Sequence, residues 1–187
     1  MIFAYLDQKT LKPEIITPEN ISVLQNAIWI DLLSPTKEEE KLVEQYLELD
    51  IPTREEMQEI EFSSRFYKIE NALFMTMTMV AKSDTLQPKN DAVTLVLEND
   101  KLITIRYIEP QSFALFIARL SKLSSKNYHA IFLLIELLES TIYRLADILE
   151  RIGHQFDEYS QNIFRPKIEI VTPWIHLNKA RKYTLYA

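Results

Sequence analysis

Residues 130–164 carry the pattern that decides the fold, and their sequence is AIFLLIELLESTIYRLADILERIGHQFDEYSQNIF. Apolar residues recur there at steps of four and three over more than four heptads, namely at Ile131, Ile135, Leu138, Ile142, Leu145, Leu149, Ile152, Phe156, Tyr159 and Ile163. This spacing predicts one helix about 50 Å long, at a rise of ~1.5 Å per residue. Because ordinary helices are much shorter, we expect its distal half to project or to meet a partner helix. A helix packed wholly inside its own domain is the alternative.

The first part of the chain predicts a sheet with helices around it. Alternating or short apolar runs predict strands at 2–6, 27–32, 66–70, 73–79, 93–97 and 102–106. Ser34 followed by Pro35 predicts the start of a helix that continues to about residue 48. Thr53 and Glu56 have capping-box spacing and predict a short helix over 54–61. A further helix is expected from Pro110 to about Lys122.

These elements predict an α+β fold, an αβα layered sandwich whose mixed, mainly antiparallel sheet is flanked by helices and followed by a long stalk-type helix. We expect Trp29 and the alternating methionines of 75–79 to lie in the core of that sandwich. The predicted domain limits are 1–126 for the layered domain, 127–164 for the long helix and 165–187 for an irregular tail. The tail contains Pro166 and Pro173 and shows no apolar period.

Composition excludes several classes of site. Gly153 is the one glycine and there is no cysteine, so a glycine-rich phosphate loop, a disulfide and a thiolate metal site are all excluded. The longest apolar run is 130–135, far short of the roughly 20 residues that cross a bilayer. The net charge of −6 comes from residues 37–61, which hold ten acidic and three basic side chains. This acidic region disfavours nucleic acid as a partner and favours cations.

The acidic region also contains the candidate metal ligands. Mg²⁺ prefers oxygen ligands and contacts few carboxylates directly, so Glu55, Glu59 and Glu61 are the residues that we expect to bind it. Solvated helix faces are the simpler interpretation of the same glutamates. The histidines at 129, 154 and 176 are too dispersed for a metal site, and no nucleophile lies near Asp31 or these glutamates in the sequence. We therefore predict no catalytic residue and no enzymatic activity.

The order of several short motifs resembles the cytoplasmic N-terminal region of CorA-type magnesium transporters, in particular the proteobacterial branch. The motifs are Trp29-Ile30-Asp31-Leu32, Ser34-Pro35 with the acidic helix after it, Glu59-Ile60-Glu61, Arg65-Phe66, Leu102-Ile103-Thr104-Ile105-Arg106, and Leu145-Ala146-Asp147 with Glu150. The similarity covers about residues 1–165. It marks Trp29, Asp31, Arg65, Thr104 and Arg106 as motif residues of the fold.

The resemblance implies a regulatory role for the cytoplasmic domain. In that family five copies form a funnel, and Mg²⁺ bound between cytoplasmic subunits holds a pore of C-terminal membrane helices shut. The acidic position of the motif corresponds to Glu59, whereas its preceding acidic neighbour is replaced by Gln58, and the stalk acid that completes the site lies beyond the matching region. The pore helices and their Gly-Met-Asn signature are missing, since Gly153 is followed by His154.

We therefore expect the Mg²⁺-sensing, gating domain of a CorA-like divalent cation transporter, with Mg²⁺ as its regulatory ion and Co²⁺ or Zn²⁺ as open alternatives. The full-length protein would form a homopentamer at the cytoplasmic face of the inner membrane, whereas this chain alone would be soluble. Ile142, Leu145, Leu149, Ile152 and Phe156 are the expected interface residues. Two alternatives are a free-standing coiled-coil adaptor and the equivalent domain of a related zinc transporter.

Overall fold

The computed structural model describes residues 1–6, 12–59, 61–122 and 128–164, so the tail expected at 165–187 lies outside the described residues. The chain divides into two compact units, Met1–Ile148 and Leu149–Ala187. The first unit holds the sheet and all the helices around it. The described part of the second is helical as far as Phe164. Within the described ranges, no helix combines the length and apolarity that crossing a membrane requires.

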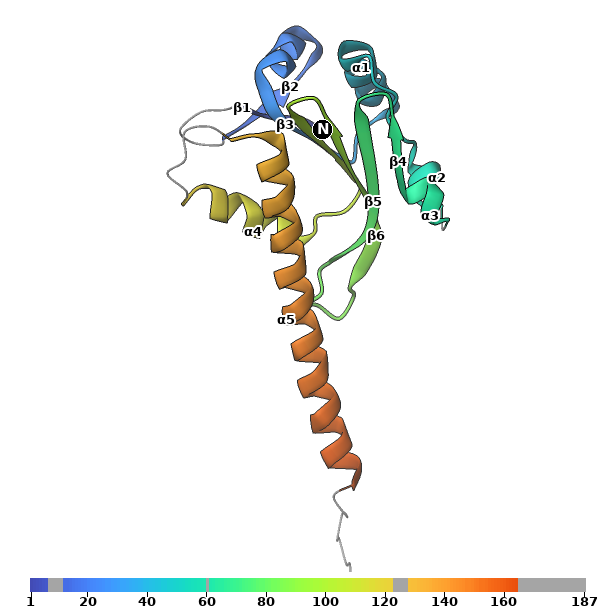
Figure 1. The fold of residues 1–187 in the computed structure, drawn as a ribbon. Coiled ribbons are helices and arrows are strands. Elements are labelled where there is room, and N and C mark those ends of the chain that lie inside the picture. Colours follow the sequence, from blue (N-terminus) through green and yellow to red (C-terminus); the bar gives the residue numbers. More distant parts are fainter. Residues whose placement is uncertain (7–11, 60, 123–127, 165–187) are drawn as a thin grey trace, which may run out of the picture. The chain divides into compact units, whose positions relative to one another are not determined.

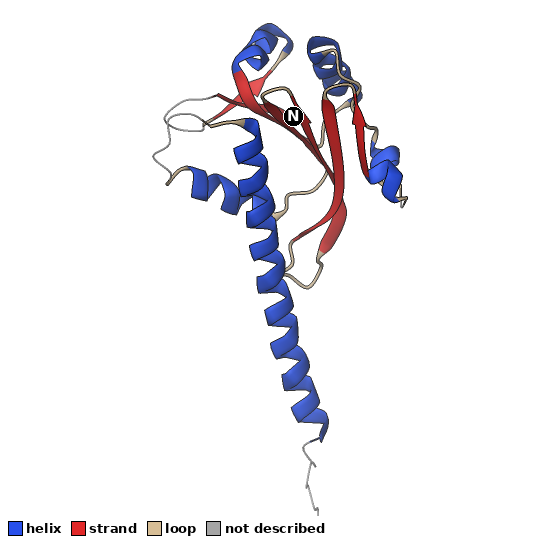
Figure 2. Ribbon diagram, in the orientation of Figure 1, coloured by secondary structure: helices blue, strands red, loops and turns tan. Residues whose placement is uncertain are grey.

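A seven-stranded sheet forms the centre of the first unit (Figures 1 and 2). Its strands lie side by side in the order β2-β1-β3-β7-β6-β5-β4. Only β3 and β7 run parallel, with Trp29 opposite Leu102 and Asp31 opposite Thr104, while every other neighbouring pair is antiparallel. The predicted mixed, mainly antiparallel sheet is confirmed. The strands are β1 Ile2–Leu6, β2 Pro13–Ile16, β3 Ala27–Leu33, β4 Phe66–Ile69, β5 Ala72–Ala81, β6 Lys89–Glu98 and β7 Lys101–Arg106.

Helices cover both faces of the sheet and give the predicted αβα sandwich, as Figure 1 shows. On one face, Leu24, Val43 and Met57 pack on the sheet from three successive helical elements: η1 Pro18–Asn26, α1 Lys37–Leu47 and α2 Arg54–Met57. On the other face, α4 Gln111–Leu120 and the first part of α5 Ala130–Phe164 pack against Trp29 and Met79. The predicted core position of the alternating methionines is confirmed for Met79, whereas Met75 and Met77 are partly buried and pack beside that second core.

Helix α1 begins later than the sequence predicts, and Ser34 is not its N-cap. Thr36 caps it: its hydroxyl accepts a hydrogen bond from the Glu39 backbone N–H at 3.3 Å, and the Glu39 carboxylate accepts one from the Thr36 N–H at 2.9 Å. Ser34 instead has a positive φ of 44° and donates its N–H to the Arg106 carbonyl at 2.8 Å. The bond to β7 holds Ser34 at the end of the sheet, so the helix can start only two residues later.

The short acidic helix after Thr53 is also shorter than expected. Its capping box is confirmed, since the Thr53 hydroxyl accepts from the Glu56 N–H at 3.3 Å and the Glu56 carboxylate accepts from the Thr53 N–H at 2.8 Å. Helix α2 nevertheless ends at Met57, and α3 spans Phe62–Arg65. Arg65 donates from its Nε to the carbonyl of Glu59 at 2.9 Å, which ties α3 to the backbone that follows α2.

Helix α5 confirms the prediction of one long helix, with 35 residues. Its N-terminal part carries two different apolar faces. Ala130, Leu133, Leu134 and Leu137 are buried against the sheet and α4, with at most 8% of each side chain exposed. The heptad positions predicted from the sequence are called the seam below: Ile131, Ile135, Leu138, Ile142, Leu145, Leu149, Ile152, Phe156, Tyr159 and Ile163. Leu138 is partly buried against the second core, whereas the exposed positions are Ile131, Ile135, Ile142, Leu145, Leu149, Ile152, Phe156 and Tyr159.

Candidate functional site

A small pocket brings acidic side chains together on the surface of the first unit. It has a volume of about 200 Å³ and is lined by Pro52, Glu56, Glu59, Ser64, Tyr67 and Thr76. The capping box of α2 fixes Glu56, and the Arg65 bond fixes the backbone at Glu59. This set is called the acidic pocket below. Because two carboxylates share one small volume, the pocket favours a cation.

The acidic pocket changes the proton affinity of its aromatic wall. Tyr67 stacks on Phe74 with ring centroids 4.8 Å apart. Burial raises the pKa of Tyr67, and the nearby carboxylates of Glu56 and Asp50 raise it further. The negative field that these carboxylates produce is the field that would hold a hydrated divalent cation. The sequence identifies Glu56 by its capping-box spacing, and that spacing gives no signal that Glu56 also lines this pocket.

The three predicted metal ligands do not all lie together. Glu59 lines the acidic pocket, whereas Glu55 and Glu61 are exposed and are not among its lining residues. In the described part of the chain, no group of three or more histidine, cysteine, aspartate or glutamate side chains is close enough to hold a metal ion. Mg²⁺ keeps several of its waters and needs only one or two protein carboxylates, which is what this pocket supplies. Metal binding at Glu55, Glu59 and Glu61 stays a prediction.

Gln58 contacts a carboxylate of β6. Its amide Nε2 donates to Asp91 Oδ1 at 3.5 Å, and Arg54 pairs with Asp91 Oδ2 at 3.0 Å. Arg54 also lies over the Tyr107 ring, 4.7 Å from its centroid. A carboxylate at position 58 would face Asp91 and repel it. Asp91 was not a candidate in the sequence, because it is far from the glutamates along the chain and only the pairing of the strands brings it beside α2.

Four of the five motif residues form one buried polar network between β3 and β7. Trp29 donates from Nε1 to the Thr104 hydroxyl at 3.1 Å, and that hydroxyl donates to Asp31 Oδ1 at 2.6 Å. Arg106 forms an ion pair with Asp31, with Nη2 2.7 Å from Oδ2 and Nε 3.0 Å from Oδ1. Asp31 is 1% exposed. This closed network stabilises the sheet and leaves Asp31 no free oxygen for chemistry on a ligand.

The surroundings of that network keep water out. Arg106 also donates from Nη1 to the Ile108 carbonyl at 3.1 Å and lies over the Phe113 ring at 4.4 Å. Tyr5 stacks on Trp29 with centroids 3.9 Å apart. Burial raises the pKa of Tyr5 to about 12; the Asp31 carboxylate adds to this effect and Arg106 opposes it. Arg65, the fifth motif residue, lies apart from the network at the end of α3.

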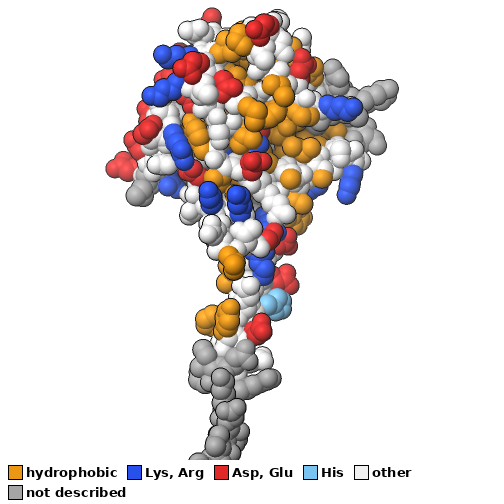
Figure 3. All heavy atoms as spheres, turned by 180° about the vertical axis from the view of Figure 1, so that it is seen from behind, with side chains coloured by type: hydrophobic (Ala, Val, Ile, Leu, Met, Phe, Trp, Pro, Cys, Tyr) orange, Lys and Arg blue, Asp and Glu red, His pale blue; other side chains and the backbone are white. Residues whose placement is uncertain are grey.

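The five predicted interface residues of the seam are exposed in the structure of the single chain. In the first unit Ile142 is 65% and Leu145 42% exposed, and in the second Leu149, Ile152 and Phe156 are 68%, 52% and 70% exposed. Figure 3 shows hydrophobic side chains at the surface of the helix between charged ones. So many exposed apolar side chains in one row are unusual for a surface that faces only water. Their role as an interface stays a prediction, because a single chain is present.

Comparison with known proteins places the chain beside one family. The model of the family described as "CorA-like Mg2+ transporter protein" matches residues 25–178. "Magnesium transport protein CorA" of Escherichia coli K12 is 31% identical over 156 residues, which are 76% of this chain and 49% of that protein. The protein of the same name from Mannheimia succiniciproducens is 28% identical over 149 residues, covering 80% and 47%. The chain thus spans about half the length of the curated relatives that it matches.

Solved structures show the same fold. The soluble domain of CorA from Methanocaldococcus jannaschii matches with a TM-score of 0.66 and 15% identity, over 87% of this chain and 64% of that one. The full-length CmaX protein matches with a TM-score of 0.56 and 12% identity, over 86% and 50% of the two chains. At these identities the likeness concerns the fold alone, and it agrees with the predicted αβα sandwich followed by a long helix.

Proposed function

The chain belongs to the CorA-like Mg²⁺ transporter protein family, and from this membership we propose that it is the Mg²⁺-sensing, gating domain of such a transporter. The family is one of transporters, so the chain is assigned no enzymatic reaction. Because it spans about half the length of its relatives, transport itself is proposed only for the full-length assembly, with this domain at the cytoplasmic face of the inner membrane.

The acidic pocket is the observation that carries this proposal. Glu56 and Glu59 offer two carboxylates around a volume of about 200 Å³, enough for a Mg²⁺ ion that keeps part of its hydration shell. Glu55 and Glu61 are exposed beside them and are available to a neighbouring copy. A carboxylate from a second copy would complete a site that one chain supplies only in part. The ion is therefore proposed to bind between copies.

Gating then follows from electrostatics. Without the ion, the acidic faces of adjacent copies repel one another, and Mg²⁺ between them removes that repulsion. The ion shifts the assembly towards the closed arrangement only by the difference in its affinity for the two states. A shift from 1:99 to 99:1 requires a difference of roughly 10⁴-fold, which several equivalent sites in a ring of copies would reach together. The full-length protein is proposed to be a homopentamer that associates through the α5 seam, among other contacts.

The test is a calorimetric titration of Mg²⁺ into the chain and into the Glu59→Gln variant, with sedimentation velocity before and after the ion is added. Glu14→Gln is the matched control, since Glu14 is an exposed glutamate on β2 that does not line the acidic pocket. We expect Mg²⁺ to increase self-association of the unchanged chain and of the control. Glu59→Gln should reduce both the heat of Mg²⁺ binding and the association that Mg²⁺ causes. Titrations that do not differ between Glu59→Gln and the unchanged chain would remove Glu59 from this account.

The exposed seam supports a second candidate, a coiled-coil adaptor that recruits a partner helix independently of any ion. Ile142 and Phe156 lie on this row, and both are at least 65% exposed. Association that is unchanged by Mg²⁺ and is abolished by Ile142→Asp would favour the adaptor. Replacing Mg²⁺ by Zn²⁺ or Co²⁺ in the same titration distinguishes the magnesium from the zinc-transporting and cobalt-transporting alternatives.

A further inference from the structure

A second, larger pocket lies at one edge of the sheet, where the parallel strands β3 and β7 both end. Its volume is about 360 Å³. Because β1 and β6 run in the opposite direction, their first residues meet the same edge, and so does the last residue of β5. The pocket, called the edge pocket below, is lined by Met1, Leu33, Ser34, Ala81, Lys82, Lys89, Tyr107, Ile108 and Glu109.

The chain leaves this edge in two opposite directions. After β3 it enters α1, whose Val43 is buried in the core on one face of the sheet. After β7 it enters α4, whose Phe113 and Phe116 are buried in the core on the other face. Neighbouring parallel strands whose following helices lie on opposite faces form a topological switch point, and the crevice outside their carboxyl ends is where open α/β sheets bind ligands.

Two lysines give the edge pocket its charge. Lys82 follows the last residue of β5, and Lys89 is the strand partner of Ala81, so both lysines lie at the ends of adjacent strands. Across the described ranges, neither of these ammonium groups has a hydrogen-bond or ion-pair partner. Like charges at one end of a sheet repel each other, and an anion between them would remove the repulsion.

The acidic groups nearby do not neutralise both lysines. Glu109 is the one carboxylate that lines the edge pocket. Glu39 is already bound to the Met1 ammonium group at 2.8 Å, and Glu40 accepts a hydrogen bond from the Tyr107 hydroxyl at 2.7 Å. In a chain of net charge −6, a pocket lined by two unpaired lysines and one carboxylate is a local exception.

From this placement we infer that the edge pocket binds a small organic phosphate, with the phosphoryl group between Lys82 and Lys89. A phosphoryl dianion matches two ammonium groups, whereas a single carboxylate would match one. Ser34 lines the same pocket, and a serine hydroxyl can donate a hydrogen bond. Leu33, Ala81 and Ile108 give the pocket an apolar wall for the organic part of the ligand.

Size supports an organic phosphate over the bare ion. At about 30 Å³ for each water of the liquid, the edge pocket holds roughly a dozen waters, well above the volume of one phosphoryl group. The volume is also within the range of about 300–1,000 Å³ that is usual for small-molecule sites. This inference does not rest on the proposed Mg²⁺ response, because none of the residues of the acidic pocket lines the edge pocket.

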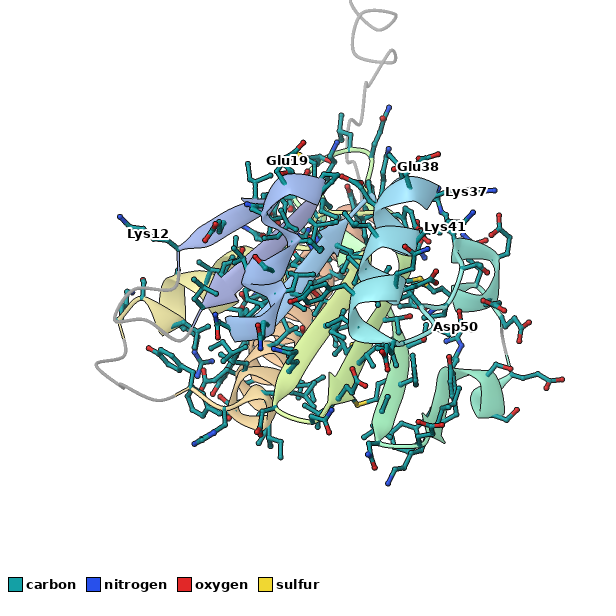
Figure 4. All side chains as sticks on the ribbon, turned by 90° about the horizontal axis from the view of Figure 1, so that it is seen from above. Lys12, Glu19, Lys37, Glu38, Lys41 and Asp50 are labelled. Carbon is teal, nitrogen blue, oxygen red and sulfur yellow. The ribbon has the colours of Figure 1, made fainter. Side chains whose placement is uncertain are left out.

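The experiment is a ligand titration of the whole chain that is monitored by two-dimensional NMR, in buffer free of divalent cations. The probes are glycerol 2-phosphate, inorganic phosphate and glycerol. The variant is Lys82→Ala/Lys89→Ala, and the matched control is Lys12→Ala/Lys41→Ala, whose two lysines are exposed, labelled in Figure 4 and absent from the edge pocket. Lys82→Gln, which keeps a long polar side chain, is the second variant should the double variant not fold.

We expect glycerol 2-phosphate to bind saturably and more tightly than inorganic phosphate, with glycerol giving no shifts. Shifts should concentrate at Ser34, Tyr107 and Ile108. Loss of both lysines should weaken binding at least about tenfold, and the control should bind as the unchanged chain does. The inference is overturned if neither phosphate binds saturably, or if Lys82→Ala/Lys89→Ala binds as tightly as the control. Glu59→Gln should leave phosphate binding unchanged, so failure of the Mg²⁺ proposal would be seen separately.

Discussion

Replacing Asp31 by alanine tests whether the network between β3 and β7 is as closed as its geometry indicates. Asp31 accepts hydrogen bonds from the Thr104 hydroxyl at 2.6 Å and from Arg106 Nη2 at 2.7 Å and Nε at 3.0 Å. The variant leaves Arg106 with the Ile108 carbonyl and the face of Phe113 as its partners. Its charge would then be buried with no opposite charge beside it.

The structure sets the size of the effect. The Arg106 side chain is 10% exposed and that of Asp31 is 1% exposed, so water can replace little of the lost interaction. Breaking a buried pair from one side costs about 3–5 kcal/mol, a large part of the 5–15 kcal/mol that typically stabilises a domain. Replacing both partners by apolar residues leaves no unpaired charge. Asp31→Leu/Arg106→Met should therefore recover most of the stability lost in Asp31→Ala.

Urea unfolding followed by circular dichroism measures these differences. We expect the midpoint to fall strongly for Asp31→Ala and to return towards the original value for the double variant, while Glu14→Ala, an exposed control, changes it little. A loss below about 1 kcal/mol for Asp31→Ala would refute the reasoning, since it would mean that Arg106 remains hydrated. A double variant as unstable as Asp31→Ala would show that packing, and not the unpaired charge, sets the cost.

Three further predictions concern other parts of the chain. The pKa of Tyr5 is raised from 10.0 to about 12, so above pH 10 the unfolded chain loses the phenol proton before the folded chain does. The stability of the fold should therefore fall as the pH rises from 10 to 12. In thermal melts, Tyr5→Phe should make the melting temperature depend less on pH over this range. Lys101 donates hydrogen bonds to the carbonyls of Leu24, Gln25 and Ala27 at 2.8–3.0 Å. Urea unfolding should therefore show that Lys101→Met lowers the free energy of unfolding by about 1–3 kcal/mol. Lys68→Met, at an exposed position of β4, should not lower it. Ile142→Asp should reduce self-association, measured by sedimentation, without lowering the melting temperature, because Ile142 is 65% exposed. An unchanged sedimentation coefficient would contradict the role of the seam as an interface.

Local patterns predicted the elements well where the signal is contained in a few neighbouring residues. The alternation at 73–79 identified β5, and the heptads after residue 130 identified α5, because side-chain period reports directly on backbone geometry. The start of α1 was wrong by two residues. Its true position depends on a bond between Ser34 and Arg106, which are far apart in the sequence and are joined only by the parallel pairing of β3 and β7.

The candidate site was predictable only in part for the same reason. Glu59 could be proposed from its motif, but its partner Glu56 had an evident role in a capping box, and a residue that satisfies one local pattern gives no sign of a second role. The edge pocket gave no sequence signal at all. Lys82 and Lys89 are ordinary surface lysines along the chain, and they become neighbours only because β5 and β6 pair at Ala81 and Lys89.

The distribution of charge around α2 explains how one domain can keep an acidic surface without losing its packing. Arg54 neutralises Asp91 at 3.0 Å, and the neutral amide of Gln58 contacts the same carboxylate, so the charge beneath α2 is matched. No such partner contacts the carboxylate of Glu59 within the described residues, and Glu59 lines a pocket together with Glu56. Glu59 is exposed, so an ion or a second copy can reach it there, as proposed above. An acid in place of Gln58 would compete with Asp91 for Arg54 and would weaken the contact of α2 with β6, so a neutral side chain at position 58 leaves the proposed ion site to Glu56 and Glu59.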